Sequence, residues 1–217
     1  GGNLVVNGSK ALVNGDNYFW ITYDISATAN EGNVLDATCE FIVANGITYK
    51  LFTNINTSSF KGILVVGSGN DQNNPSEGAI NGAAETALCE KATANGYAAA
   101  IVKYRKTPGT ADWNNSAKMI GEDYDKVISA ISGKYGIDKS RSVIAGFSYS
   151  SYLLLTDIAY NNTLSYTKGL LAACASTDQD KINKFKIPVL SLTGRDENEG
   201  NANNFTGVTL YNKIPAN

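Results

Sequence analysis

The sequence contains no histidine. Histidine is the commonest general base in enzymes and the commonest ligand of transition metals, because its imidazole changes charge near neutral pH and offers a neutral nitrogen. Any catalysis by these 217 residues must therefore take its base from another residue type or another molecule. We expect no metal site and no cofactor.

Charge and long apolar runs are also scarce. Charged residues make up 18% of the chain, and the net charge of −2 provides no basic field for nucleic acid or an anionic membrane surface. No apolar run approaches the roughly 20 residues that span a bilayer. The length and the hydrophobic fraction of 43% predict one soluble domain with a substantial core. Acidic residues without arguable ligand geometry are interpreted as solvated helix faces; they are Asp71, Glu77, Asp112, Glu122, Asp123 and Asp125.

The three cysteines have no metal-like spacing, and each lies in an apolar neighbourhood. Cys39, Cys89 and Cys174 are therefore interpreted as buried, inert thiols, while one disulfide with a thiol left over stays open. Asn-x-Ser/Thr sequons, which matter only where the host glycosylates, favour a secreted or extracytoplasmic protein. The sequons begin at Asn7, Asn56, Asn114, Asn161 and Asn204.

The predicted secondary-structure pattern changes after the first 36 residues. Residues 1–36 predict a β-meander, because Asn7-Gly8 and Asn14-Gly15 carry the strongest short hairpin signal between apolar runs. Residues 37–217 alternate strands with helices, which predicts a mostly parallel sheet covered on both faces. Strands are expected at 47–55, 62–67, 97–104, 142–145, 169–175 and 187–193, and helices at 79–95, 113–135, 149–160 and 178–185.

The sharpest local signal is Gly146-Phe147-Ser148-Tyr149-Ser150, where a buried strand ends and a helix begins at once. In a nucleophile elbow, the residues two before and two after the serine must be small, because the strand and the helix pass close together. Gly146 meets that demand fully, and Ser150 departs from the usual glycine. Such a pattern also arises by chance in a chain rich in Gly and Ser, but its position between a core strand and an apolar helix favours the elbow.

Residues 61–196 resemble the α/β-hydrolase family in four successive pieces. Residues 62–70 are similar to the strand that leads to the oxyanion loop, and 96–105 to the next strand, which often ends in Tyr-Arg. Residues 123–150 resemble the helix, connector and elbow of its esterases and peptidases. Residues 187–196 are similar to the strand and turn that present the catalytic acid. The resemblance implies an α/β-hydrolase sheet, with the N-terminal β-meander part of it or appended to it.

The resemblance also implies a catalytic order of serine, acid and histidine. Ser148 would be the nucleophile, and Asp196 would be the acid, with Glu197 and Glu199 as competitors. One further helix and strand would put the histidine roughly 20–30 residues past the acid. Because the sequence stops at Asn217 without one, we expect the histidine in a lost, cleaved or separate C-terminal segment.

The oxyanion hole would need two backbone N–H groups. The resemblance implies the N–H of Tyr149 as one donor, and the N–H of Ser68 or Gly69 as the other. This loop departs from the family's His-Gly-Gly form, which leaves the second donor open. A dinucleotide loop at Gly67-Ser68-Gly69 is disfavoured, because the third glycine and an acidic residue after the next strand are missing.

The expected function is therefore a serine hydrolase that cleaves a carboxylic ester through an acyl-enzyme intermediate. The substrate would be a small-molecule or polysaccharide-linked ester, although the family also cleaves peptide bonds. The alternative is a catalytically inactive binding or surface protein on the same fold, which would explain the absent histidine and the Ser150 departure together.

Overall fold

The computed structural model describes residues 39–54, 57, 59–175, 177 and 179–194, all of which belong to one of two units of the chain, Asp36–Asn217. The meander predicted at 1–36 lies outside this range, and so do Asp196, Glu197 and Glu199. Within it, no helix is long and apolar enough to cross a membrane.

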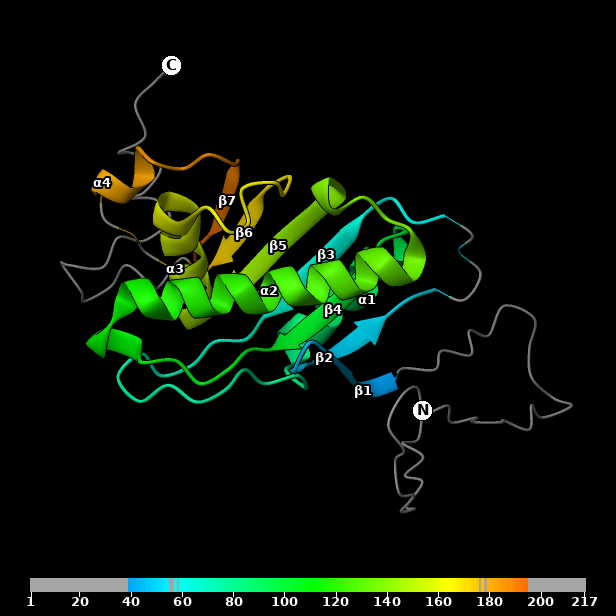
Figure 1. Cartoon of the computed structure of the whole chain (residues 1–217), viewed down its shortest axis with the longest axis horizontal. Helices are drawn as coiled ribbons and strands as arrows, with labels where there is room; N and C mark the ends of the chain where they lie inside the picture. The colour runs from blue at the N-terminus through cyan, green and yellow to red at the C-terminus, as the bar shows by residue number, and fades with distance from the viewer. Residues whose placement is uncertain (1–38, 55–56, 58, 176, 178, 195–217) are drawn as a thin grey trace, which may run out of the picture. The chain divides into compact units, whose positions relative to one another are not determined.

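A seven-stranded sheet forms the centre of this unit, with the strand order β1-β2-β4-β3-β5-β6-β7. β2 runs antiparallel to both of its neighbours, and the pairs from β4 to β7 are parallel (Figure 1). This confirms the predicted mostly parallel sheet. The strands are β1 Cys39–Ala44, β2 Ile47–Phe52, β3 Ile63–Gly67, β4 Ala98–Lys103, β5 Ser142–Phe147, β6 Leu170–Ala173 and β7 Val189–Leu192.

The first hairpin follows from its turn residues. Asn45 and Gly46 both have positive φ, 51° and 77°, as a two-residue turn with the twist of the flanking strands requires. The strand after the turn was predicted, but β1 before it was not. β1 is a short apolar run that pairs with β2, its one neighbour among the described strands, and periodicity alone cannot distinguish such a run from a piece of helix.

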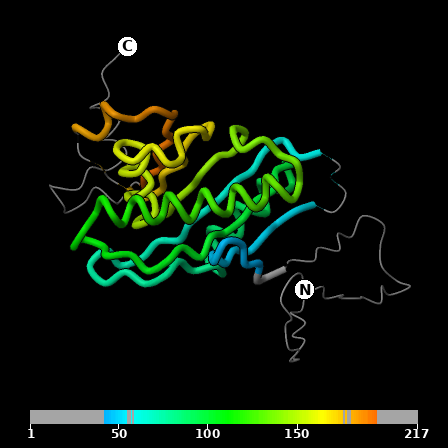
Figure 2. Tube along the Cα trace, in the orientation of Figure 1, coloured from blue at the N-terminus to red at the C-terminus, as the bar shows by residue number. Residues whose placement is uncertain are grey.

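Helices cover the two faces of the sheet unequally. α2 (Trp113–Tyr135) and α3 (Tyr149–Thr156) pack against one face, and α1 (Ala83–Ala94) packs against the other over β2, β3 and β4. The trace in Figure 2 shows α2 lying along the sheet. The short α4 (Gln179–Ile182) precedes β7. α1 begins later than the predicted residue 79, because the chain at residues 78–79 hydrogen-bonds to groups near the ends of β3 and β4 instead.

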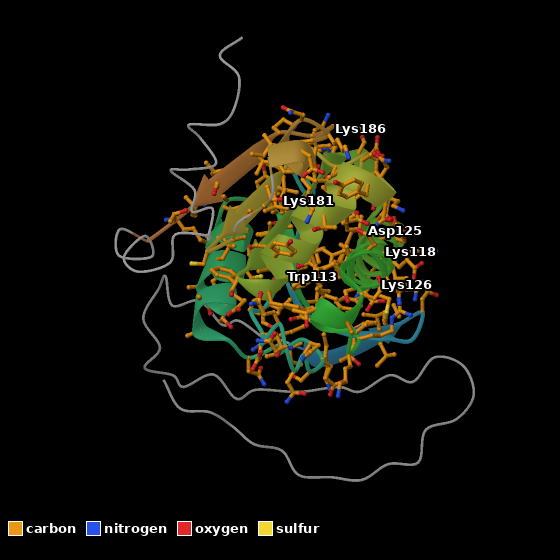
Figure 3. The ribbon with its side chains drawn as sticks, turned by 90° about the vertical axis from the view of Figure 1, so that its left-hand side faces the viewer. Trp113, Lys118, Asp125, Lys126, Lys181 and Lys186 are labelled. Carbon is orange, nitrogen blue, oxygen red and sulfur yellow. The ribbon has the colours of Figure 1, made fainter. Side chains whose placement is uncertain are left out.

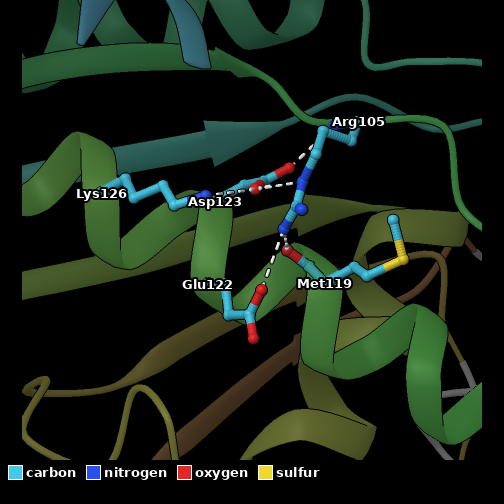
Figure 4. Close-up of polar contacts among 5 residues, drawn as sticks. All are labelled: Arg105, Met119, Glu122, Asp123 and Lys126. Carbon is cyan, nitrogen blue, oxygen red and sulfur yellow. Dashed lines mark hydrogen bonds and ion pairs between the residues drawn. The ribbon is translucent and has the colours of Figure 1, made fainter. Parts of the chain in front are cut away.

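Asp123 on α2 corrects one expectation, because it is fully buried rather than part of a solvated face. Its carboxylate accepts hydrogen bonds from the Arg105 backbone N–H and Nε, both at 2.8 Å (Figure 4). Burial raises the pKa of Asp123, and the Arg105 bonds and the charges of Arg105 and Lys126 oppose that rise. Arg105 also donates to Glu122 at 3.0 Å and to the Met119 carbonyl at 3.3 Å. These contacts attach the chain after β4 to α2.

Two of the three cysteines have described side chains, and these two lie in different environments; the prediction for Cys39 lies outside the described side chains. Cys89 on α1 is fully buried, and burial raises the pKa of its thiol to about 12, which confirms the prediction for this residue. The prediction is wrong for Cys174, which is exposed. The reason is local: β6 ends at Ala173, so Cys174 already belongs to the turn at the carboxyl end of the sheet, with φ of 56°.

Candidate active site

Ser148 occupies the single-residue turn between β5 and α3. Its φ of 49° and ψ of −110° put a non-glycine residue in a sparsely populated backbone region. Such a conformation costs about 1–3 kcal/mol and persists only where the surroundings impose it. The side chain is exposed at the carboxyl end of a parallel strand, which is the position that the sequence pattern predicted.

Backbone contacts on both sides hold this turn. The Ser148 N–H donates to the Ala173 carbonyl of β6 at 2.7 Å, and the Ser148 carbonyl accepts from the Tyr152 N–H at 3.0 Å. A Cβ at Gly146 would lie 2.6 Å from the Ser151 backbone nitrogen, closer than real contacts allow. Only glycine therefore lets α3 fold back against the end of β5.

Tyr149 is the first residue of α3, and its side chain is held in place by neighbouring residues. The Ser148 hydroxyl makes no capping hydrogen bond at the start of α3, and the first N–H groups of a helix have no acceptor within it. Tyr149 is buried, and its hydroxyl hydrogen-bonds to that of Thr107. Its ring centroid lies 6.0 Å from that of Trp113. Trp113, labelled in Figure 3, is the first residue of α2. The Tyr149 N–H is thus held at a helix N-terminus beside the serine, where the helix dipole favours negative charge.

The loop after β3 passes directly over the serine. A Cβ at Gly69 would lie 3.4 Å from the Ser148 Cβ, so the two backbones approach closely. Ser68 has its side chain occupied elsewhere, because its hydroxyl accepts from the Ala79 N–H at 2.9 Å. The buried Tyr104 hydroxyl donates to the Ser68 carbonyl at 2.9 Å. Ser68 and Gly69 were both predicted as the second oxyanion donor. Of the two, Gly69 is the residue whose backbone lies against Ser148.

The Tyr-Arg pair at the end of β4 connects this loop to α2. Burial raises the pKa of Tyr104 to about 12, so its hydroxyl keeps the proton that it donates to Ser68. The adjacent Arg105 is bound to Asp123 of α2. One residue of the pair thus holds the loop above Ser148, and the other holds the chain to the helix layer.

Below the turn lie buried hydroxyl groups that the sequence pattern did not predict. The Tyr124 hydroxyl donates to the Ala145 carbonyl of β5 at 2.8 Å, and burial raises the pKa of Tyr124 well above its usual value. The Ser151 hydroxyl lies 3.0 Å from both the carbonyl oxygen and the amide nitrogen of Ala173. The sequence does show a cluster of serines at the start of α3. Serines are equally common at solvent-exposed helix starts, so the cluster did not indicate that these hydroxyl groups are buried.

A shallow hollow lies along the same edge of the sheet. It has a volume of about 490 Å³ and is open to solvent. Lys103, whose Nζ lies 2.8 Å from a carboxylate oxygen of Glu77, borders it at the end of β4. The other residues around it are Gly78, Ala79, Ile80, Asn81 and Gly82. The described part of the chain contains no group of three or more Cys, Asp or Glu side chains arranged to hold a metal ion.

Solved structures with related architecture are found despite low sequence identity. A protein of Klebsiella pneumoniae described as a dienelactone hydrolase superimposes with a TM-score of 0.53 and 16% identity, over 73% of this chain and 72% of that one. In this chain the fold consists of a mostly parallel seven-stranded sheet with helices on both faces. The chain has the α/β-hydrolase fold.

A second structure with similarity to this α/β-hydrolase fold is dipeptidyl peptidase 4 of Porphyromonas gingivalis. It has a TM-score of 0.56 and 16% identity, over 82% of this chain but 30% of the peptidase. No family model matches the sequence, and no curated protein matches it. Identity of this order establishes the fold, whereas an activity has to be argued from the residues of the site.

Proposed function

We propose that this protein is a serine hydrolase that cleaves a carboxylic ester through an acyl-enzyme intermediate, with Ser148 as the nucleophile. The observation that carries the proposal is the backbone of Ser148, exposed at a strand-to-helix turn with φ of 49°. A fold does not keep a strained, solvent-facing serine for packing, and such strain is concentrated at functional sites. The turn makes the hydroxyl accessible to a substrate from the carboxyl edge of the sheet.

The chemistry would proceed in two halves. The Ser148 Oγ attacks the ester carbonyl carbon while a base accepts its proton, and the carbonyl oxygen becomes an oxyanion. The Tyr149 N–H and the Gly69 N–H, or alternatively the Ser68 N–H, would donate to that oxyanion. Collapse breaks the bond to the alcohol, which leaves with the proton. Water then attacks the acyl-enzyme, releases the carboxylic acid and returns the proton to Ser148.

Histidine is the usual base of a serine hydrolase, and these 217 residues include none. We propose that a separate C-terminal segment supplies a histidine, which Asp196 would orient. An ester is the better substrate for such a site than a peptide, because an amine leaving group has to be protonated before it departs. The substrate would be a small-molecule or polysaccharide-linked ester, and an extracytoplasmic location stays part of the proposal.

Chemical rescue tests the proposal with the chain as it exists. Labelling by a fluorophosphonate probe is measured at pH 7.5 with and without added imidazole, which replaces the missing base in solution. We expect slow labelling of the unmodified chain, because a serine hydroxyl without an adjacent base is a weak nucleophile. Imidazole should accelerate labelling by roughly tenfold, below the 10²–10⁴ of a positioned base. Ser148→Ala should abolish the labelling. Ser165→Ala, a change at another exposed serine, should leave the labelling rate unchanged.

Each other outcome has a defined meaning. Equal labelling of the Ser148→Ala variant would eliminate Ser148 as the nucleophile. Rapid labelling without imidazole would show that another group of the chain acts as the base. A folded chain that imidazole does not activate would favour the inactive binding or surface protein on the same fold.

A further inference from the structure

The Ser150 hydroxyl stands between two strands beneath the turn. The side chain is fully buried. Its Oγ accepts from the Phe147 N–H of β5 at 2.9 Å and donates to the Gly67 carbonyl of β3 at 2.8 Å, with the Phe147 carbonyl as a second acceptor at 3.2 Å. One hydroxyl therefore connects the strand that carries the serine turn with the strand that leads into the loop above it.

This contact lies where the two strands separate. Gly67 pairs with Gly146 at the end of the β3–β5 ladder, and beyond it β3 continues into the loop that passes over Ser148. Both glycines lie against Ser150. A Cβ at Gly67 would overlap the Tyr124 hydroxyl and lie 3.2 Å from the Ser150 Cβ, and a Cβ at Gly146 would lie 2.9 Å from the Ser150 Oγ. The serine thus fits a slot that the two strand ends leave for it.

We infer that Ser150 is a positioning residue, whose hydroxyl sets the distance between Ser148 and the N–H groups of the Ser68-Gly69 loop. The inference rests on the proposed function. An oxyanion donor is effective only at about 2.7–3.1 Å from the oxyanion, so a small displacement of the loop lowers the rate. A glycine in place of Ser150 would fit the same slot but could not join β5 to β3. The departure from the usual glycine is therefore a functional feature of this chain.

The test compares Ser150→Ala with Thr156→Val. Thr156 is also fully buried on α3, but its hydroxyl donates within the helix to the Tyr152 carbonyl, away from the strand ends. We expect Ser150→Ala to accelerate amide hydrogen exchange at residues 67–70 by roughly tenfold. In imidazole it should lower the maximal rate of fluorophosphonate labelling about 10- to 100-fold, with the half-saturating probe concentration unchanged. Ser150→Gly should behave in the same way, and Ser150→Cys, which keeps a weak donor, should recover part of both effects.

The exchange measurement separates this inference from the proposed function, because it needs no catalysis. If the unmodified chain is not labelled at Ser148, the proposed function fails and exchange alone decides whether Ser150 holds the loop. If Ser150→Ala exchanges at residues 67–70 no faster than Thr156→Val, the inference is overturned. It is also overturned if both variants lose labelling equally, because a general loss of stability would then suffice. Should Ser150→Ala not fold, Ser150→Cys answers the same question.

Discussion

The burial of Asp157 between α3 and α2 predicts how the stability of the protein depends on pH. Asp157 begins the π-helical turn Asp157–Asn161 that continues α3, and it is fully buried against α2, where a Cβ at Gly121 would collide with its carboxylate. Burial raises its pKa to about 7. Groups of Thr163, Leu164 and Asn161 oppose the rise, but neither carboxylate oxygen has a well-directed hydrogen bond.

The direction of the pH effect follows from the two pKa values. The carboxyl loses its proton near pH 3.8 in the unfolded chain and near pH 7 in the folded protein. Between these values the folded state binds the extra proton, so the free energy of unfolding falls as the pH rises, by about 1.4 kcal/mol per pH unit. The full loss over this window is about 4 kcal/mol and is complete above pH 7. Asp157→Asn removes the titration, and we expect the variant to be about 2–4 kcal/mol more stable at pH 8.

Urea unfolding between pH 4 and pH 8 measures this difference. The stability of Asp157→Asn relative to the unmodified protein should increase steadily with pH and level off above pH 7. Glu90→Gln, at an exposed position on α1, serves as the control and should show no such trend. A constant difference between the Asp157 variant and the unmodified protein across the range would refute the argument from burial.

Three further predictions concern the strand ends and the thiols. Gly146→Ala should lower the free energy of unfolding by about 2–4 kcal/mol, because its Cβ would lie 2.6 Å from a backbone nitrogen of α3; unchanged urea unfolding would contradict that close approach. Arg105→Ala should cost about 2–4 kcal/mol in the same assay, since it removes the guanidinium that pairs with the buried Asp123 carboxylate, and Arg105→Lys should recover only part. Cys174 should react with a disulfide reagent within minutes while Cys89 reacts only after unfolding, which peptide mass spectrometry would show; early modification of Cys89 would argue against its burial.

Local sequence signals determined the order of the elements and the turn that carries Ser148. The bounds predicted for α2, 113–135, agree with the structure, because both ends have local causes. The Asp112 side chain accepts from the Asn115 N–H at the start, and Gly136 adopts the left-handed conformation at the end. The serine turn was predictable for the same kind of reason, since the small residue at Gly146 is required by chain segments that are adjacent in sequence.

The tertiary structure alone decided what lies opposite each side chain. Asp123 has the same acidic character as its helix neighbours, and only the path of the chain after β4 buries it and gives it an arginine partner. From the sequence, Ser150 is a less suitable small residue than glycine at this position. Only the structure shows that its hydroxyl donates to the Gly67 carbonyl at the end of β3. Burial and hydrogen bonding depend on contacts between residues far apart in the chain, in the case of Ser150 and Gly67 by 83 positions. Periodicity, caps and turn residues act over a few positions, and they carry no information about such partners.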